Sequence, residues 1–155
     1  FEKIWTKIPL SLKKMTLSQS ILEISDFTLE KNDPYPILFK ILVETLQHFE
    51  TGSLDENICF WHYESKLLSE MGFLIDMEDR NLNVEDLVSL EKTDNSFKVL
   101  SKLIEGNVFD IDFKNISKID KKNISKFLYQ KLCYYFDGFE RLKSFRVIKD
   151  IFYNG

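Results

Sequence analysis

The sequence predicts a mainly α-helical protein, a compact bundle of about five to six helices with a small irregular β-hairpin inserted into it. Apolar residues recur at helical spacing in several separate segments. The chain has only five glycines and three prolines, which favours helices over a turn-rich β-sandwich. Its 155 residues are 44% hydrophobic and 14% aromatic, a composition that suits one domain with a substantial core.

Two helices are predicted in the first third of the chain. The first spans residues 10–29, with apolar side chains at Leu17, Ile21, Leu22 and Phe27. The polar run 31–34, which ends in Pro34, stops it. The second helix spans residues 36–50. Its apolar stripe consists of Leu38, Ile41, Leu42, Thr45, Leu46 and Phe49.

The most apolar stretch, residues 54–76, is predicted to contain the central helix. Gly52 suits the left-handed position after the second helix, and Ser53 with Glu56 matches a capping box that would start the third. The short link between these two helices favours antiparallel packing. The apolar face is expected to contain Phe60, Trp61, Leu67, Leu68 and Met71, and the polar face His62, Ser65, Lys66 and Ser69.

Glu64 lies in the middle of that apolar face. A carboxylate there must find a partner or stay protonated, because an unpaired buried charge is very costly. We expect Glu64 to be a structural buried charge, held by Lys143 or Arg146. The alternative is that Glu64 orients a basic residue that contacts a ligand.

The remaining segments are more varied. Residues 76–96 are polar around a short apolar run and predict the irregular hairpin. A short helix is expected over residues 97–104, ending at Gly106, and residues 107–116 are expected to be extended or looped. Two further helices are predicted over residues 121–136 and 142–152, separated by a break at Asp137-Gly138.

Motifs for catalysis or cofactor binding are absent from the sequence. There is no Gly-rich phosphate loop, no G-x-S-x-G elbow and no H-E-x-x-H. Two cysteines, Cys59 and Cys133, and two histidines, His48 and His62, lack metal-ligand spacing, so no metal and no cofactor are expected. The longest apolar run is too short to span a bilayer. We therefore expect no enzyme activity, no small-molecule substrate and no membrane partner.

Charge is distributed unevenly along the chain. Residues 50–113 carry five basic and fifteen acidic side chains, whereas residues 114–155 carry ten basic and four acidic ones. The basic part is either an anion-binding face or a partner for the acidic part. Candidate contacts with DNA or an acidic peptide lie along one edge of the last predicted helix. They are Arg141, Lys143, Arg146 and Lys149.

Several motifs follow one another in order along the chain. The residues Tyr63-Glu64, Leu67-Leu68 and Met71-Gly72-Phe73 form one of them. They resemble the F-E-x-x-L-L-x-x-L-G-[FY] signature of the bacterial DNA-repair protein family RecO. Gly138 followed by Leu142-Lys143-Ser144 is similar to the RecO C-terminus, and the segments 33–39 and 86–90 match in order. Phe145 stands where RecO usually has a basic residue, and the zinc-type cysteines of many members are missing around Arg80.

The resemblance implies the C-terminal helical domain of RecO over residues 10–155. Residues 1–9 would be a tail or the end of an N-terminal OB-fold that this chain does not contain. Proteins of this family mediate DNA repair and recombination in the bacterial cytoplasm, at the nucleoid. The implied partners are single- and double-stranded DNA, RecR and the C-terminal tail of single-stranded-DNA-binding protein, and the implied activities are strand annealing and RecA loading.

A second hypothesis stays open. The chain could be a helical protein-interaction or scaffold domain without a nucleic-acid role. In that case the acidic segment would neutralise the basic edge. Replacing Lys143 and Arg146 by Glu would then lower stability without changing the affinity for any ligand.

Overall fold

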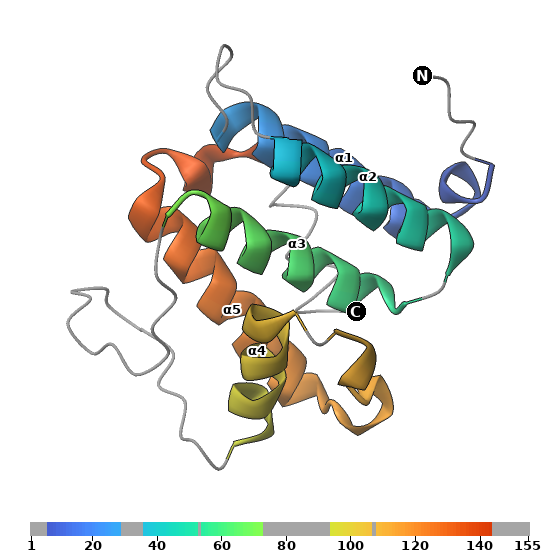
Figure 1. Ribbon diagram of the computed structural model, residues 1–155, viewed down its shortest axis with the longest axis vertical. Coiled ribbons are helices and arrows are strands. Elements are labelled where there is room, and N and C mark those ends of the chain that lie inside the picture. Colours follow the sequence, from blue (N-terminus) through green and yellow to red (C-terminus); the bar gives the residue numbers. More distant parts are fainter. Residues whose placement is uncertain (1–5, 29–35, 53, 73–93, 107, 144–155) are drawn as a thin grey trace.

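The computed structural model describes residues 6–28, 36–52, 54–72, 94–106 and 108–143. Five α-helices are present in this part of the chain: α1 (Leu12–Thr28), α2 (Pro36–Thr51), α3 (Glu56–Glu70), α4 (Asn95–Glu105) and α5 (Lys118–Tyr135) (Figure 1). The described residues also form four short 3-10 turns. The turn η1 (Ile8–Leu10) precedes α1, η2 (Val108–Asp110) and η3 (Phe113–Asn115) lie between α4 and α5, and η4 (Phe139–Arg141) follows α5. No strand occurs in the described ranges. The predicted mainly helical fold is confirmed.

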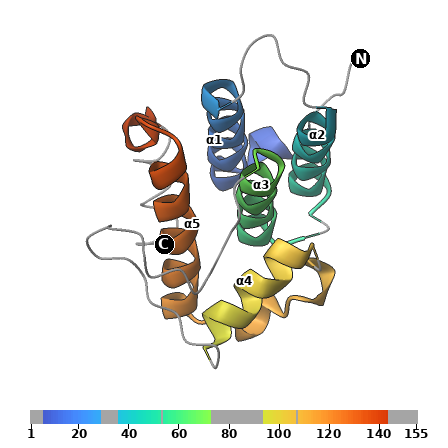
Figure 2. The same cartoon turned by 60° about the vertical axis from the view of Figure 1, so that its left-hand side comes forward.

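Helix α3 is the centre of the bundle. Helices α1, α2, α4 and α5 all contact it, and Figure 2 shows them arranged around it. The predicted apolar face is confirmed, since Phe60, Trp61, Leu67 and Leu68 are buried. The predicted polar face was wrong at Ser65, because neighbours on several sides bury most of the helix. Ser65, expected on the polar face, is 2% exposed and donates its hydroxyl hydrogen to the Trp61 carbonyl at 2.8 Å. His62 and Lys66 are half-buried.

The connection between α2 and α3 produces the expected antiparallel pair (Figure 1). Gly52 has a φ of 69°, and its N–H donates to the His48 carbonyl at 2.8 Å. The predicted capping box at Ser53 was wrong. Asp55 caps α3 instead, since its side chain accepts from the Asn57 N–H at 2.8 Å. The N-cap of α3 is therefore Asp55, which is closer to the first helical turn than the predicted Ser53.

A carboxylate at the end of α2 holds the segment before α1. Glu50 Oε1 accepts from the Thr6 and Lys7 N–H groups, each at 2.7 Å, and Oε2 accepts from the Ile8 N–H at 2.8 Å. Thr6 Oγ1 donates to Oε1 as well, at 2.8 Å. Ile8 is 7% exposed and joins the core. Residues 6–8 are therefore fixed against α2.

Helix α4 ends at Gly106, as predicted, and Gly106 has a φ of 85°. The predicted end of the hairpin at residue 96 was wrong. Asp94 is the N-cap of α4, and Asn95 and Ser96 are already helical. Residues 73–93, which contain the rest of the predicted hairpin, lie outside the described residues. The expected loop over 107–116 contains the turns η2 and η3.

Helix α5 begins three residues earlier than predicted. Ser117 and Asp120 form a capping box that the sequence analysis missed. Asp120 Oδ1 also accepts from the Ser96 hydroxyl at 2.6 Å, which ties the start of α5 to the start of α4. The second predicted C-terminal helix lies almost wholly in residues 144–155, outside the described part. None of the described helices has the length and apolarity that a bilayer span requires.

Candidate functional site

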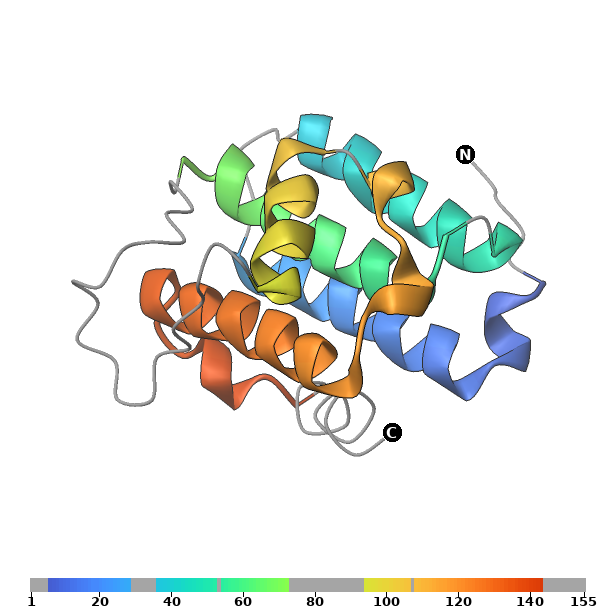
Figure 3. The same cartoon turned by 90° about the horizontal axis from the view of Figure 1, so that it is seen from below.

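The predicted basic site begins at the turn that follows α5. The helix ends when the Phe136 N–H donates to the Leu132 carbonyl, and Gly138 then takes a φ of 84°. This left-handed conformation favours glycine, because it brings a Cβ too close to the following carbonyl. The chain turns back as η4, which lies beside α5 (Figure 3).

Phe139 anchors η4 in the core. Its side chain is 0% exposed, and its ring packs edge-on against Phe27 of α1, with the centroids 6.2 Å apart. Tyr129 of α5 packs on the same ring, also at 6.2 Å. Leu142 is partly buried against the core. Buried apolar residues thus fix the backbone that carries the neighbouring basic side chains.

Arg141 and Lys143 are both exposed on this anchored turn. The Arg141 guanidinium folds back over Gly138, where an added Cβ would lie 2.6 Å from Nη2. Gly138 therefore serves two purposes, since it permits the turn and leaves space for Arg141. Of the four predicted basic contacts, Arg146 and Lys149 lie outside the described residues.

Glu64 is buried in α3, with 2% of its surface exposed. Burial raises the pKa of its carboxyl well above the ordinary value. The structure describes both Glu64 and Lys143, and no ion pair joins them. Arg146, the other predicted partner, lies outside the described residues, so that pairing stays a prediction.

A second buried ionisable residue was missed. Lys131 of α5 is 2% exposed, and its Nζ lies 5.5 Å from the centroid of the Phe127 ring. The sequence contains a signal for this burial, because Lys131 follows Ile124 by seven residues and Phe127 by four, which places it on the apolar face of α5. Charge distribution alone places Lys131 only among the basic residues of the C-terminal segment.

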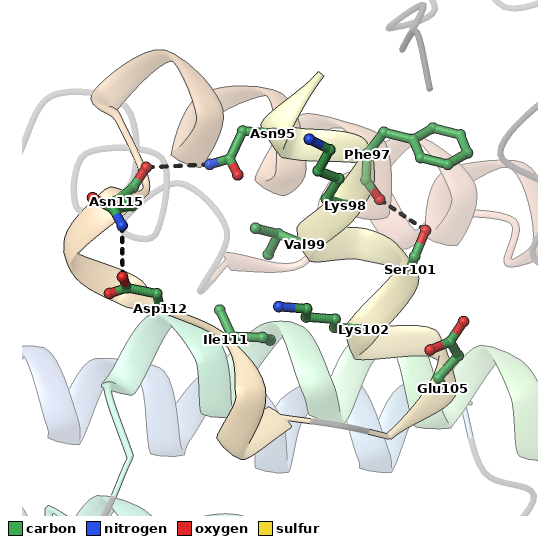
Figure 4. Close-up of a pocket in the computed structure, with 10 residues that line it drawn as sticks. All are labelled: Asn95, Phe97, Lys98, Val99, Ser101, Lys102, Glu105, Ile111, Asp112 and Asn115. Carbon is green, nitrogen blue, oxygen red and sulfur yellow. Dashed lines mark hydrogen bonds between the residues drawn. The ribbon is translucent and has the colours of Figure 1, made fainter. Parts of the chain in front are cut away.

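A groove of about 480 Å³ lies between α4 and the segment that contains η3 (Figure 4). Lys98 and Lys102 extend from α4 along it. Lys102 Nζ donates to the Asp110 carbonyl at 2.9 Å, and Asn115 Nδ2 donates to Asp112 Oδ2 at 2.6 Å. These polar groups stabilise the wall of the groove, and no nucleophile with an adjacent base lines it.

A smaller cavity of about 190 Å³ lies between α2, α3 and η2, and both histidines line it. The His48 ring packs edge-on against Phe109, with the centroids 6.0 Å apart. The His62 Nδ1 is buried and finds no hydrogen-bond partner among the described residues. Within those residues, no three His, Cys, Asp or Glu side chains are grouped so as to hold a metal ion.

One known family model matches a segment in the first part of the chain. Residues 9–83 match the family model described as Recombination protein O C terminal. In this segment the chain is similar to the C-terminal domain of the RecO family. The match includes α1, α2 and α3 and ends before α4. No curated protein and no solved structure matches the chain.

The RecO match therefore covers only part of the predicted site. Glu64 and the Leu67-Leu68 pair lie inside the matched segment, together with Gly72, which has a φ of 85°. The turn at Gly138 and the basic residues after it lie outside it. The predicted resemblance of that part to the RecO C-terminus rests on the sequence motif alone.

Proposed function

We propose that this chain is the helical domain of a RecO-type mediator of DNA repair and recombination. In this role it binds single- and double-stranded DNA, RecR and the acidic C-terminal tail of single-stranded-DNA-binding protein, and promotes strand annealing and RecA loading. It acts in the bacterial cytoplasm at the nucleoid, without catalysing a reaction. The family match over residues 9–83 is the observation that carries this proposal.

The turn η4 supplies the physical support for ligand binding. Arg141 and Lys143 present positive charge on a backbone that Phe139 holds in the core. Phosphate groups and peptide carboxylates are both recognised by charge-assisted hydrogen bonds from such side chains. A basic rim next to an apolar surface suits an acidic peptide that ends in a hydrophobic residue.

Binding measured by fluorescence polarisation tests the proposal. The probes are labelled single- and double-stranded DNA, and an acidic peptide with a C-terminal Phe, in low salt. We expect binding to weaken in the double variant Arg141→Gln/Lys143→Gln. The matched control is Lys7→Gln/Lys40→Gln, which removes the same charge from exposed side chains. Lys7 directly precedes η1, and Lys40 lies in α2.

Two outcomes separate the proposal from the scaffold hypothesis. Loss of binding in the Arg141 and Lys143 variant alone supports the RecO-type role. If the unchanged chain ignores both DNA and the peptide at low salt, the role fails. The scaffold hypothesis is favoured if no ligand binds and the variant Lys143→Glu/Arg146→Glu has a lower free energy of unfolding than the unchanged chain.

A further inference from the structure

Helix α5 carries a row of lysines that the predicted site does not include. Lys118, Lys122 and Lys126 are spaced four residues apart, so that at 3.6 residues per turn they lie within about 80° of one another. Lys118 and Lys122 are exposed, and Lys126 is half-buried. Helix α5 lies at an edge of the bundle (Figure 2). We call these three residues the lysine ridge.

Most of the buried residues of α5 lie on the side of the helix opposite the ridge. At 100° per residue this side carries Ile124, Phe127, Leu128 and Lys131. Ser125 is also buried and lies near the Lys118 side, where its hydroxyl accepts from the Trp61 indole of α3 at 3.0 Å. Lys118 and Lys122 are exposed beside this contact.

Positive charge on the ridge is not neutralised within the described part of the chain. None of the three lysines forms an ion pair with another described residue. Asp120, the nearest carboxylate in the sequence, accepts hydrogen bonds from Ser117 and from the side chains of Asn95 and Ser96. These bonds hold Asp120 at the junction of α4 and α5.

The ridge leads to the predicted basic turn. Tyr129 follows Lys118 by eleven residues, about 16 Å along the helix, and points to the same side of α5. Its ring packs on Phe139, the first residue of η4, and η4 ends at Arg141. The side of α5 that carries the lysines thus contacts the turn that carries Arg141.

We propose that the lysine ridge binds the phosphate backbone of a nucleic-acid strand and extends the Arg141 site along α5. This inference rests on the proposed DNA-binding function. Lysines act as point charges that contact phosphates without reading sequence. A protein partner would need an apolar core to its interface, but the large hydrophobic side chains exposed on the described part of α5, Ile119 at 72% and Tyr134 at 52%, are fifteen residues apart.

The test compares three variants of the full chain in polarisation titrations with a labelled single-stranded oligonucleotide of mixed sequence. The ridge variant is Lys118→Gln/Lys122→Gln/Lys126→Gln. The conservative variant replaces the same lysines by Arg. The control is Lys7→Gln/Lys40→Gln/Lys98→Gln, which removes the same charge from exposed positions outside α5. Thermal unfolding of each variant shows that the fold is kept.

Salt dependence is the decisive measurement. Each lost phosphate contact lowers the slope of log K against log salt by about 0.7 for a single strand, so the ridge variant should lose about 2 from this slope. The Arg variant and the control should keep the slope of the unchanged chain. An unchanged slope in the ridge variant, or an equal loss in the control, would overturn the ridge alone. Absence of binding by the unchanged chain would overturn both the ridge and the proposed function.

Discussion

The Trp61 indole N–H of α3 donates to the Ser125 hydroxyl of α5 at 3.0 Å, inside the core. Trp61 is 0% exposed and Ser125 is 8% exposed. A buried N–H that loses its acceptor retains the full cost of desolvation. This bond therefore specifies how α5 packs on the central helix as well as contributing to stability.

Replacing Ser125 by Ala should lower the free energy of unfolding by about 1–3 kcal/mol, because the indole N–H then lacks this acceptor. Urea unfolding followed by tryptophan fluorescence measures the change. Ser101→Ala is the matched control, since Ser101 is half-buried and, among the described residues, its hydroxyl donates only to the Phe97 carbonyl of its own helix. Equal losses in the two variants would show that the bond between the helices is unimportant.

Replacing Gly138 by Ala should weaken DNA binding as well as stability. The left-handed φ of 84° costs a residue with a Cβ about 1–2 kcal/mol, and the new methyl group would displace the Arg141 guanidinium. Gly72→Ala provides a control with the same backbone strain, since Gly72 has a φ of 85° and no described residue lies within 4 Å of an added Cβ. Both variants should unfold more easily, and only Gly138→Ala should bind DNA less tightly.

Glu64→Gln tests whether the buried carboxyl is neutral or paired. Burial raises the pKa of Glu64 above its ordinary value of 4.5, so the folded state binds the proton more tightly than the unfolded state. The stability that this contributes is complete below pH 4.5 and is lost as pH rises through the folded pKa. We expect the Glu64→Gln variant to have a similar free energy of unfolding. Urea titrations at several pH values should show that this free energy falls less with rising pH than it does in the unchanged chain. A loss of about 3–5 kcal/mol at neutral pH would instead indicate a broken ion pair with a basic residue.

Glu50→Gln should release the segment before α1. Burial opposes ionisation of Glu50, but the hydrogen bonds from the backbone of Lys7 and Ile8 and from Thr6 lower its pKa from 4.5 to about 2. The stabilisation is complete above pH 4.5 and is lost as pH falls through about 2. Amide hydrogen exchange at residues 6–8 should therefore be slow at about pH 4 and fast in the variant. Glu44→Gln, on the exposed side of α2, should leave this exchange unchanged.

His62 should make the domain less stable in mild acid. Burial lowers the pKa of His62 below its ordinary value of 6.5, and the charge of Lys66 lowers it further. The unfolded state then binds more protons, so the stabilisation is complete above pH 6.5 and is lost as pH falls through the folded pKa. NMR titration of the imidazole should give a value below 6.5. His62→Gln should remove part of the acid destabilisation, and an unchanged pH profile would contradict this assignment.

Helical periodicity located most of the described elements. It predicted α1, α2, α3 and the break at Gly138, because each of these follows from local spacing or from a residue that must adopt a particular backbone conformation. It also placed Glu64 among apolar residues. The first residues of α3 and α5 were predicted less accurately. Several polar residues near each start could serve as the N-cap, and Asp55 and Ser117 are the ones that do.

Burial on more than one side of a helix could not be read from local spacing. Ser65 and Lys131 are buried although both are polar, because α3 is surrounded by other helices and α5 packs against it. The bond between the Tyr63 and Ser25 hydroxyls joins residues that are far apart in the sequence. Burial of that phenol raises the pKa of Tyr63 to about 12. No periodic pattern in one segment specifies the partner in another.

The sequence by itself determined that the chain forms helices, placed a carboxyl at the centre of an apolar one, and identified Gly138 and Arg141 as a turn with a basic side chain. These properties depend on the spacing and chemistry of nearby residues. Only the tertiary structure showed that α3 is enclosed, and that α5 packs against the turn η4, which carries Arg141. Such relationships depend on how helices pack, and packing joins residues through contacts that lie far apart along the chain.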